Sequence, residues 1–137
     1  MSEMLPKFPD WFVPQGQCPP ADAVDTSGEI FCFASKVPVT PEEFRSYHEK
    51  GDRPNGRLCE RCGLSVFKKA EHVRRLLLHL WKNYPEKVYG PHIVRRELTP
   101  SDGKIKPTGG KDHHTWWAYE GVERHASFTL VETAQIS

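Results

Sequence analysis

The residues best suited to chemistry are two cysteines, Cys59 and Cys62, which form a CxxC motif followed by Gly63. In a zinc knuckle this arrangement turns backbone amides toward the two thiolates. A tetrahedral zinc site needs four ligands, and the sequence contains no second CxxC. The candidates for the missing ligands are Cys32 and His48, followed by Cys18 and His92. A structural zinc ion bound by Cys59, Cys62, Cys32 and His48 is therefore one interpretation of the motif.

Two other interpretations of the CxxC motif are open, a redox pair and two cysteines that bind nothing. A redox CxxC usually begins a helix in a βαβ unit, whereas a strand-like segment, 64–67, follows here, so zinc is favoured over redox chemistry. The first residues lack the apolar run of a secretory signal, and no stretch is apolar enough to span a bilayer. We therefore expect a cytoplasmic protein without membrane contact, whose cysteines are reduced rather than paired.

A second candidate site is the segment from His113 to Tyr119. On a strand, His113 and Trp117 share one face, while His114 and Trp116 share the other. If one tryptophan faces the core, the other is partly exposed beside histidines, which suits a ligand or partner platform. If the N-terminal segment covers the outer face, both tryptophans are buried. The predicted ligand- or partner-binding residues are His113, His114, Trp116, Trp117 and Tyr119.

Basic residues on neighbouring predicted strands form a third candidate site, a strip that would bind phosphates. Its members are Arg95, Arg96, Lys104 and Lys106. Acidic residues interleave with them, and the whole chain has a formal charge of only +1, so no global field attracts nucleic acid. Nucleic-acid binding is therefore the third and least favoured function. No glycine-rich nucleotide loop or GxSxG motif occurs, and Ser65 has no sequence context that marks it as a nucleophile.

The elements that must position these residues indicate an α+β fold. The chain of 137 residues has the length of one domain. Thr40, Pro41 and Glu43 form a capping box before a helix predicted over 41–50. Apolar residues at three- and four-residue steps predict a second helix over about 69–84, ended by Pro85. Its apolar stripe comprises Val73, Leu76, Leu77, Leu80, Trp81 and Tyr84.

Short strands are predicted around these helices, over 29–34, 64–67, 92–98, 104–106, 113–119 and 126–131. This order favours a mainly antiparallel sheet with two helices packed on one face, in a single domain over residues 28–137. Residues 1–27 are rich in proline and predict an extended arm. The arm carries Phe8, Trp11 and Phe12, which either wrap the domain or dock on a partner.

Four short motifs carry a resemblance to other proteins. They are Pro38-x-Thr40-x-Glu-Glu43-Phe44-x-Ser46, Gly63-Leu-Ser65-Val66-Phe67, Ile105-Lys-Pro107-Thr108 and His114-Thr-Trp-Trp117. Together they resemble a group of small uncharacterised bacterial proteins over roughly residues 28–131. Some members of that group are loosely similar to compact ADP-ribosyltransferase folds, which implies NAD-dependent transfer. This chain has Cys32 where that fold has a first-strand arginine, and it lacks the Glu-x-Glu or Gln-x-Glu of those enzymes.

These observations favour a small binding or interaction module with a protein partner. Its expected working surface is the His113–Trp117 strand together with the loop 52–63. The alternative is a small NAD-dependent ADP-ribosyltransferase-like enzyme with His113, His114 and Tyr119 lining its pocket. Nucleic-acid binding is third. No catalytic residue is assigned.

Overall fold

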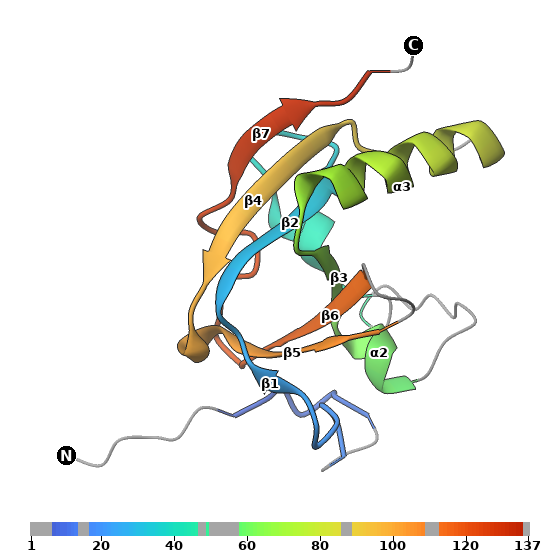
Figure 1. Ribbon diagram of the computed structural model, residues 1–137. Coiled ribbons are helices and arrows are strands. Elements are labelled where there is room, and N and C mark those ends of the chain that lie inside the picture. Colours follow the sequence, from blue (N-terminus) through green and yellow to red (C-terminus); the bar gives the residue numbers. More distant parts are fainter. Residues whose placement is uncertain are drawn as a thin grey trace.

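A computed structural model describes residues 7–13, 17–46, 49, 58–85, 89–108 and 113–135. Within these ranges, seven strands form one antiparallel sheet of order β1-β5-β6-β3-β2-β4-β7, accompanied by two α-helices (Figure 1). The predicted α+β class is thereby confirmed. The strands are β1 (Val24–Asp25), β2 (Gly28–Ala34), β3 (Leu64–Phe67), β4 (His92–Leu98), β5 (Gly103–Pro107), β6 (His113–Ala118) and β7 (Thr129–Thr133). The helices are α2 (Leu58–Cys62) and α3 (Ala70–Asn83), with 3-10 turns η1 (Pro41–Phe44) and η2 (Pro100–Asp102).

The sheet is strongly curved (Figure 1). Strands β2 and β4 lie toward one end of the curve, and β5 and β6 lie toward the other. Its concave side holds one apolar core, to which β2, β3, β4, β5 and β6 contribute alternate side chains. The largest of these is Trp116, which is completely buried. Phe44 of η1 stacks on Phe128 with ring centroids 4.7 Å apart and closes the core on the side away from the sheet.

The opposite, convex side of the sheet carries α3. The helix buries Val73 and Leu77 against Phe67 of β3 and Ile93 of β4, as the apolar stripe predicts. Tyr84 is an exception, because α3 ends at Asn83 and the tyrosine beyond it is 45% exposed. None of the helices described in these ranges is long and apolar enough to cross a membrane.

The first predicted helix is wrong in the part that the structure describes. Pro41–Phe44 forms a 3-10 turn, Arg45 is extended, and Glu49 is helical again, so the predicted helix is not continuous. The reason is that Glu43 does not close a capping box. Its carboxylate accepts hydrogen bonds from the backbone N–H and the hydroxyl of Ser35 instead. Residues 47, 48 and 50, at the end of the predicted helix, lie outside the described residues.

A short helix that the sequence did not predict lies at the CxxC motif, where α2 covers Leu58–Cys62. The N-terminal segment packs beside it. Phe8, Trp11 and Phe12 form a cluster with Trp117, which projects from the convex side of β6. Residues 24 and 25, expected to belong to the arm, form β1 and pair with β5 at one edge of the sheet.

Candidate functional site

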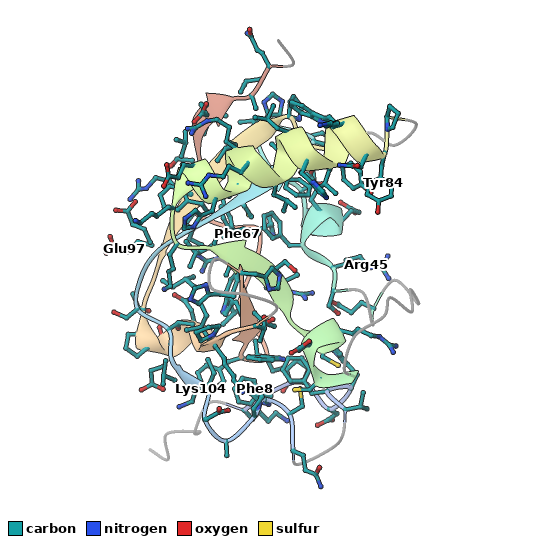
Figure 2. All side chains as sticks on the ribbon, turned by 45° about the vertical axis from the view of Figure 1, so that its right-hand side comes forward. Phe8, Arg45, Phe67, Tyr84, Glu97 and Lys104 are labelled. Atoms are coloured by element: carbon teal, nitrogen blue, oxygen red, sulfur yellow. A yellow bond between two sulfur atoms is a disulfide. The ribbon has the colours of Figure 1, made fainter. Side chains whose placement is uncertain are left out.

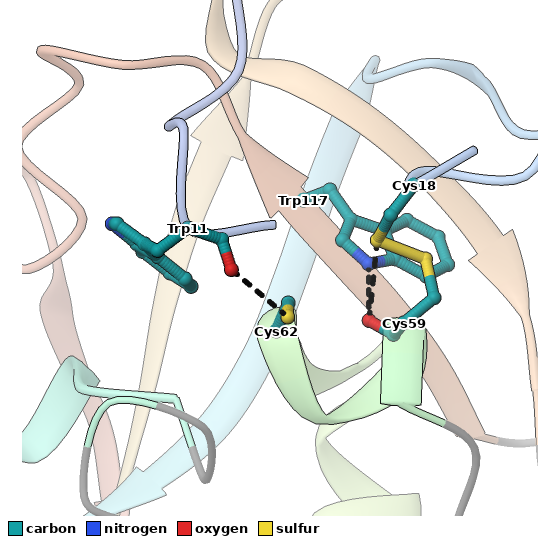
Figure 3. Close-up of a disulfide and its surroundings, with 5 residues drawn as sticks. All are labelled: Trp11, Cys18, Cys59, Cys62 and Trp117. Atoms are coloured by element: carbon teal, nitrogen blue, oxygen red, sulfur yellow. Dashed lines mark hydrogen bonds between the residues drawn. A yellow bond between two sulfur atoms is a disulfide. The ribbon is translucent and has the colours of Figure 1, made fainter. Parts of the chain in front are cut away.

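Cys18 and Cys59 form a disulfide, which corrects the prediction that the cysteines are reduced (Figure 3). The bond joins the N-terminal segment to α2 across 41 residues. The sequence did not reveal it because the pairing of four cysteines cannot be deduced from their spacing. A cysteine binds zinc through its thiolate sulfur. In this oxidised form the sulfur of Cys59 is bonded to Cys18, so it cannot bind a metal ion.

The other predicted zinc ligands are not brought together. Cys62 is buried with Trp117 on the convex side of the sheet, whereas Cys32 lies in the concave core. His48 lies outside the described residues. Among the residues that are described, no group of three or more histidine, cysteine or carboxylate side chains is placed to hold a metal ion. A zinc site at Cys59 and Cys62 therefore remains a prediction for the reduced chain alone.

Both tryptophans of the predicted platform are completely buried, so neither offers an exposed surface. Trp117 donates a hydrogen bond from Nε1 to the carbonyl oxygen of Cys59 at 2.8 Å, beneath the N-terminal segment. Trp116 donates from Nε1 to the carbonyl oxygen of Asp102 at 3.0 Å, and the guanidinium of Arg96 lies 5.4 Å from the centre of its ring. Of the two arrangements open from the sequence, the structure has the one in which the arm covers the outer face.

His113 is the first residue of β6, and both of its ring nitrogens have hydrogen-bond partners. Its Nδ1 lies 2.8 Å from the carbonyl oxygen of Thr108, which can only accept, and 3.0 Å from the hydroxyl oxygen of the same residue, which can donate or accept. The tautomer that satisfies both contacts has its proton on Nδ1. Its Nε2 is then the acceptor for the hydroxyl of Ser65, 2.8 Å away on β3. A hydroxyl, an imidazole and a group that orients the imidazole are the parts of an activated nucleophile. His114 points to the opposite face of the strand, opposite Val66, and is not part of this set.

A cleft of about 210 Å³ opens at the other end of β6. Its walls come from four parts of the chain that are distant in sequence. They are the N-terminal segment, residue 49, the end of α2 with the start of β3, and the end of β6 with the turn that follows it. The polar or aromatic residues among those that line it are Trp11, Phe12, Glu49, Cys62, Trp116, Tyr119, Glu120 and Arg124. Trp116 and Tyr119, from the predicted binding residues, and Cys62, from the predicted zinc ligands, contribute to it.

An ion pair lies at the cleft. Arg124 donates from Nη1 and Nη2 to the two carboxylate oxygens of Glu49, at 2.6 and 2.9 Å, and each side chain is only 22% exposed. The backbone N–H of Ser46 donates to the same carboxylate at 2.8 Å. Burial alone would raise the pKa of Glu49, but the hydrogen bonds from Arg124 and Ser46 outweigh it and hold the pKa below its ordinary value. Glu49 therefore stays ionised at neutral pH.

Aromatic contacts hold the N-terminal wall of the cleft against the turn after β6. Phe8 lies 4.7 Å from Tyr119 and 5.5 Å from Phe12, measured between ring centroids. Trp11 packs edge-on against Phe12 at 4.8 Å. The backbone N–H of Glu120 donates to the carbonyl oxygen of Lys7 at 2.7 Å. The N-terminal segment is thus a structural part of the cleft rather than a separate tail.

Sequence reasoning missed Glu49, Glu120 and Arg124. No motif marks them, because the cleft forms only where segments far apart in the sequence meet. Glu49 and Arg124 are separated by 75 residues. The only available signal was indirect: three aromatic residues in a segment rich in proline required a surface to cover.

The predicted basic strip is not a continuous positive surface. Register places Arg95 opposite Phe31 and Arg96 opposite Ile30, so the two arginines face opposite sides of the sheet. Each basic residue also has a carboxylate partner. The pairs are Arg95–Glu29 at 2.7 Å, Arg96–Asp102 at 3.1 Å, Lys104–Asp25 at 2.6 Å and Lys106–Asp22 at 2.9 Å.

Comparison with protein-family models, curated proteins and solved structures finds no match to this chain. The resemblance to small bacterial proteins and to ADP-ribosyltransferase folds therefore stays a prediction, and the function is argued from the geometry.

Proposed function

We propose that the protein is an interaction module that takes one basic side chain of a partner protein in the cleft. Size supports a single side chain. Pockets that enclose drug-sized ligands measure roughly 300–1,000 Å³, and this cleft, at about 210 Å³, is smaller. Trp11 and Tyr119, which line the cleft, are both partly exposed, so a side chain of a partner can reach their rings.

The observation that carries the proposal is the combination of aromatic walls with an excess of carboxylate. Two of the charged residues that line the cleft are carboxylates, Glu49 and Glu120, and one is a guanidinium, Arg124. The lining thus carries one more negative than positive charge. A lysine or arginine side chain between Trp11 and Tyr119 gains a cation–π contact with the rings. It is also attracted to Glu120, where it competes with the exposed ion pair that Lys7 makes with this carboxylate at 3.2 Å. An acidic side chain would meet carboxylates instead.

The proposed module differs from the predicted one in its surface. The His113–Trp117 strand was expected to expose one of its tryptophans, whereas both are buried beneath other elements. The strand supports the cleft from below through Trp116 and Ala118, and the turn that follows it supplies Tyr119 and Glu120.

Small probes test this proposal. Calorimetric titration with Nα-acetyl-L-arginine N-methylamide and its lysine counterpart is expected to give weak binding, with a Kd of about 1 mM. The norleucine counterpart, which has a similar length and no charge, is expected to bind at least about tenfold more weakly. Equal binding of the norleucine probe, or no binding of either basic probe, would contradict the proposal.

Matched variants locate the binding to the cleft. Trp11→Ala and Glu120→Gln should each weaken binding of the arginine probe, because they remove a ring face and a carboxylate. Tyr119→Ala should do the same, with Tyr84→Ala as its control. Tyr84 is an exposed tyrosine beyond the end of α3, and Figure 2 shows it at the opposite end of the molecule from Phe8. An equal loss in the Tyr84 variant would argue against the cleft.

A second candidate function, hydrolysis of small esters, is favoured by the hydrogen bonds of His113. Ser65 is exposed, and its hydroxyl lies 2.8 Å from the unprotonated Nε2. The oxygen of Ser65 would attack the ester carbonyl and form an acyl-enzyme, while His113 takes the proton and passes it to the leaving alcohol. Water then releases the acid.

Ser65→Ala and His113→Gln should lower hydrolysis of p-nitrophenyl acetate by about 100-fold or more. His114→Gln, on the opposite face, is the control. Unchanged rates in the Ser65 variant would eliminate this function.

A further inference from the structure

Three cysteines meet where the N-terminal segment packs on α2. Cys18 and Cys59 are joined, and Cys62 is a free thiol in the same short helix as Cys59. Residues three apart on a helix are neighbours, and the rise and radius of the helix place their Cα atoms about 5 Å apart. Disulfides join cysteines whose Cα atoms are about 4.4–6.8 Å apart. Cys59 therefore has two cysteines within reach, and it can bond to only one of them at a time.

We propose that Cys18, Cys59 and Cys62 form a thiol–disulfide exchange site that regulates the cleft; the regulation rests on the function proposed above. Cys62 loses its proton to solvent, and its sulfur attacks Sγ of Cys59. The Cys59–Cys62 bond forms as the Cys18–Cys59 bond breaks, and Cys18 leaves as a thiolate that takes up a proton. The number of disulfides and the number of protons are unchanged, so the step needs no oxidant or reductant.

The N-terminal segment controls this step. Cys62 is only 1% exposed, and its sulfur lies 4.0 Å from the carbonyl oxygen of Trp11 (Figure 3). Both Cys62 and the disulfide face this segment, which covers them. Burial also raises the pKa of the Cys62 thiol, which keeps it protonated and unreactive while the segment is seated. Exchange is therefore slow in the closed form and becomes faster when the segment lifts.

Exchange changes the cleft because the disulfide anchors one of its walls. Cys18, Phe12 and Trp117 belong to one apolar cluster, and the disulfide ties that cluster to α2. Once Cys18 is released, the wall that carries Trp11 loses this covalent anchor and keeps its weaker contacts, among them the apolar cluster, the hydrogen bond from Glu120 to Lys7 and the Lys7–Glu120 ion pair. The Cys18–Cys59 form is thus the binding form, and the Cys59–Cys62 form has a loosened wall.

The fourth cysteine is a natural control. Cys32 is buried in the concave core among residues of β2 and β4, on the other side of the sheet from Trp117. It lines no part of the cleft. Cys32→Ala removes a thiol from the chain without touching the exchange site.

Peptide mapping tests the exchange without any ligand. The full chain is purified without reductant, held at pH 6.5 or 8.5, acidified and treated with a maleimide. Trypsin then cuts after Arg61 and separates Cys59 from Cys62, while a glutamate-specific protease cuts after Glu29 and separates Cys18 from Cys32. We expect Cys18–Cys59 peptides at pH 6.5 and a growing share of Cys59–Cys62 peptides at pH 8.5. Peptides that join Cys59 only to Cys18 at both pH values and all times would overturn the exchange.

A binding measurement then tests the regulation. In the Cys18→Ser variant, Cys62 is the one cysteine of the exchange site that can still pair with Cys59. This variant should bind the arginine probe at least tenfold more weakly than the wild-type chain. Cys32→Ala should bind within about twofold of wild type. Equal affinity of the Cys18 variant would overturn the regulation. If neither the wild-type chain nor any variant binds, the proposed function fails, and the peptide map still decides the exchange.

Discussion

Arg124 donates two hydrogen bonds to Glu49, at 2.6 and 2.9 Å, and so joins the turn after β6 to a segment 75 residues earlier. The pair closes one side of the cleft. It also holds the segment that leads to Phe128, which stacks on Phe44 over the concave core. Stability and binding therefore depend on the same contact.

The pair makes stability depend on pH in the acid range. The pKa of Glu49 is lower in the folded protein than in the unfolded chain, so the unfolded chain binds the proton more readily. The stabilisation is fully present above the ordinary carboxyl pKa of about 4.3. It is lost as the pH falls through the lower, folded value. Urea unfolding between pH 7 and pH 3 should show this decline for the wild-type chain.

Arg124→Gln should flatten that decline, because it removes the donors that hold the pKa of Glu49 down. Arg74→Gln is the matched control. Arg74 binds Glu132 in the same way, but both side chains are more exposed, and solvent weakens the pair. An acid-side slope that is the same in the Arg124 variant as in the wild-type chain would show that Glu49 is not the group responsible.

Reduction of the disulfide should destabilise the protein by about 2–4 kcal/mol, because the bond restricts a loop of 41 residues in the unfolded chain. Urea unfolding with and without a phosphine reductant measures the loss. The double variant Cys18→Ser/Cys59→Ser should have the lowered stability of the reduced wild-type chain, both with and without the reductant. If the reductant lowers the stability of this double variant as well, the effect comes from another source.

Two adjacent leucines of α3 provide a test of the helix face. Leu77 is completely buried between α3 and the sheet, and Leu77→Ala should cost about 2–5 kcal/mol of unfolding free energy. Leu78 is 45% exposed, and Leu78→Ala should change stability by less than about 0.5 kcal/mol. Equal losses measured by urea unfolding would mean that α3 is rotated about its axis.

Helix α3 also shows how far the sequence predicts this fold. Its apolar stripe is a local pattern, so it correctly identified Val73 and Leu77 as core residues. The strands 64–67 and 92–98 were predicted with the bounds that the structure has. For the last strand, predicted over 126–131, the structure has Thr129–Thr133, because residues 124–127 form a turn.

The errors that bear on the site concern contacts that local patterns do not show. The capping box at Thr40 and Glu43 is a local signal, but Ser35 competes for the carboxylate and the helix does not extend. The pairing of Cys18 with Cys59 is invisible in the spacing of four cysteines. The cleft has the same origin, since each of its walls comes from a different segment. Local patterns therefore predicted the elements, and tertiary contacts determined the site.

Gly63 is the point where α2 turns directly into β3, and its lack of a side chain lets β6 approach closely. A Cβ at this position would lie 2.3 Å from Cγ2 of Thr115 and 3.0 Å from the carbonyl oxygen of Trp116. Gly63→Ala should therefore destabilise the protein by about 1–3 kcal/mol, because the strand pair must shift to remove the overlap. Urea unfolding measures the cost.

Thr115→Ser tests whether the threonine methyl is the obstacle. The substitution removes Cγ2 and keeps the hydroxyl, which lies 2.7 Å from Oγ1 of Thr108. Combined with Gly63→Ala, it should restore part of the lost stability. The double variant should then lose less unfolding free energy than the two single variants lose in sum. The carbonyl oxygen of Trp116 stays in place, so the recovery should be incomplete. Strict additivity of the two substitutions would show that the strand approach at Gly63 is not limited by Thr115.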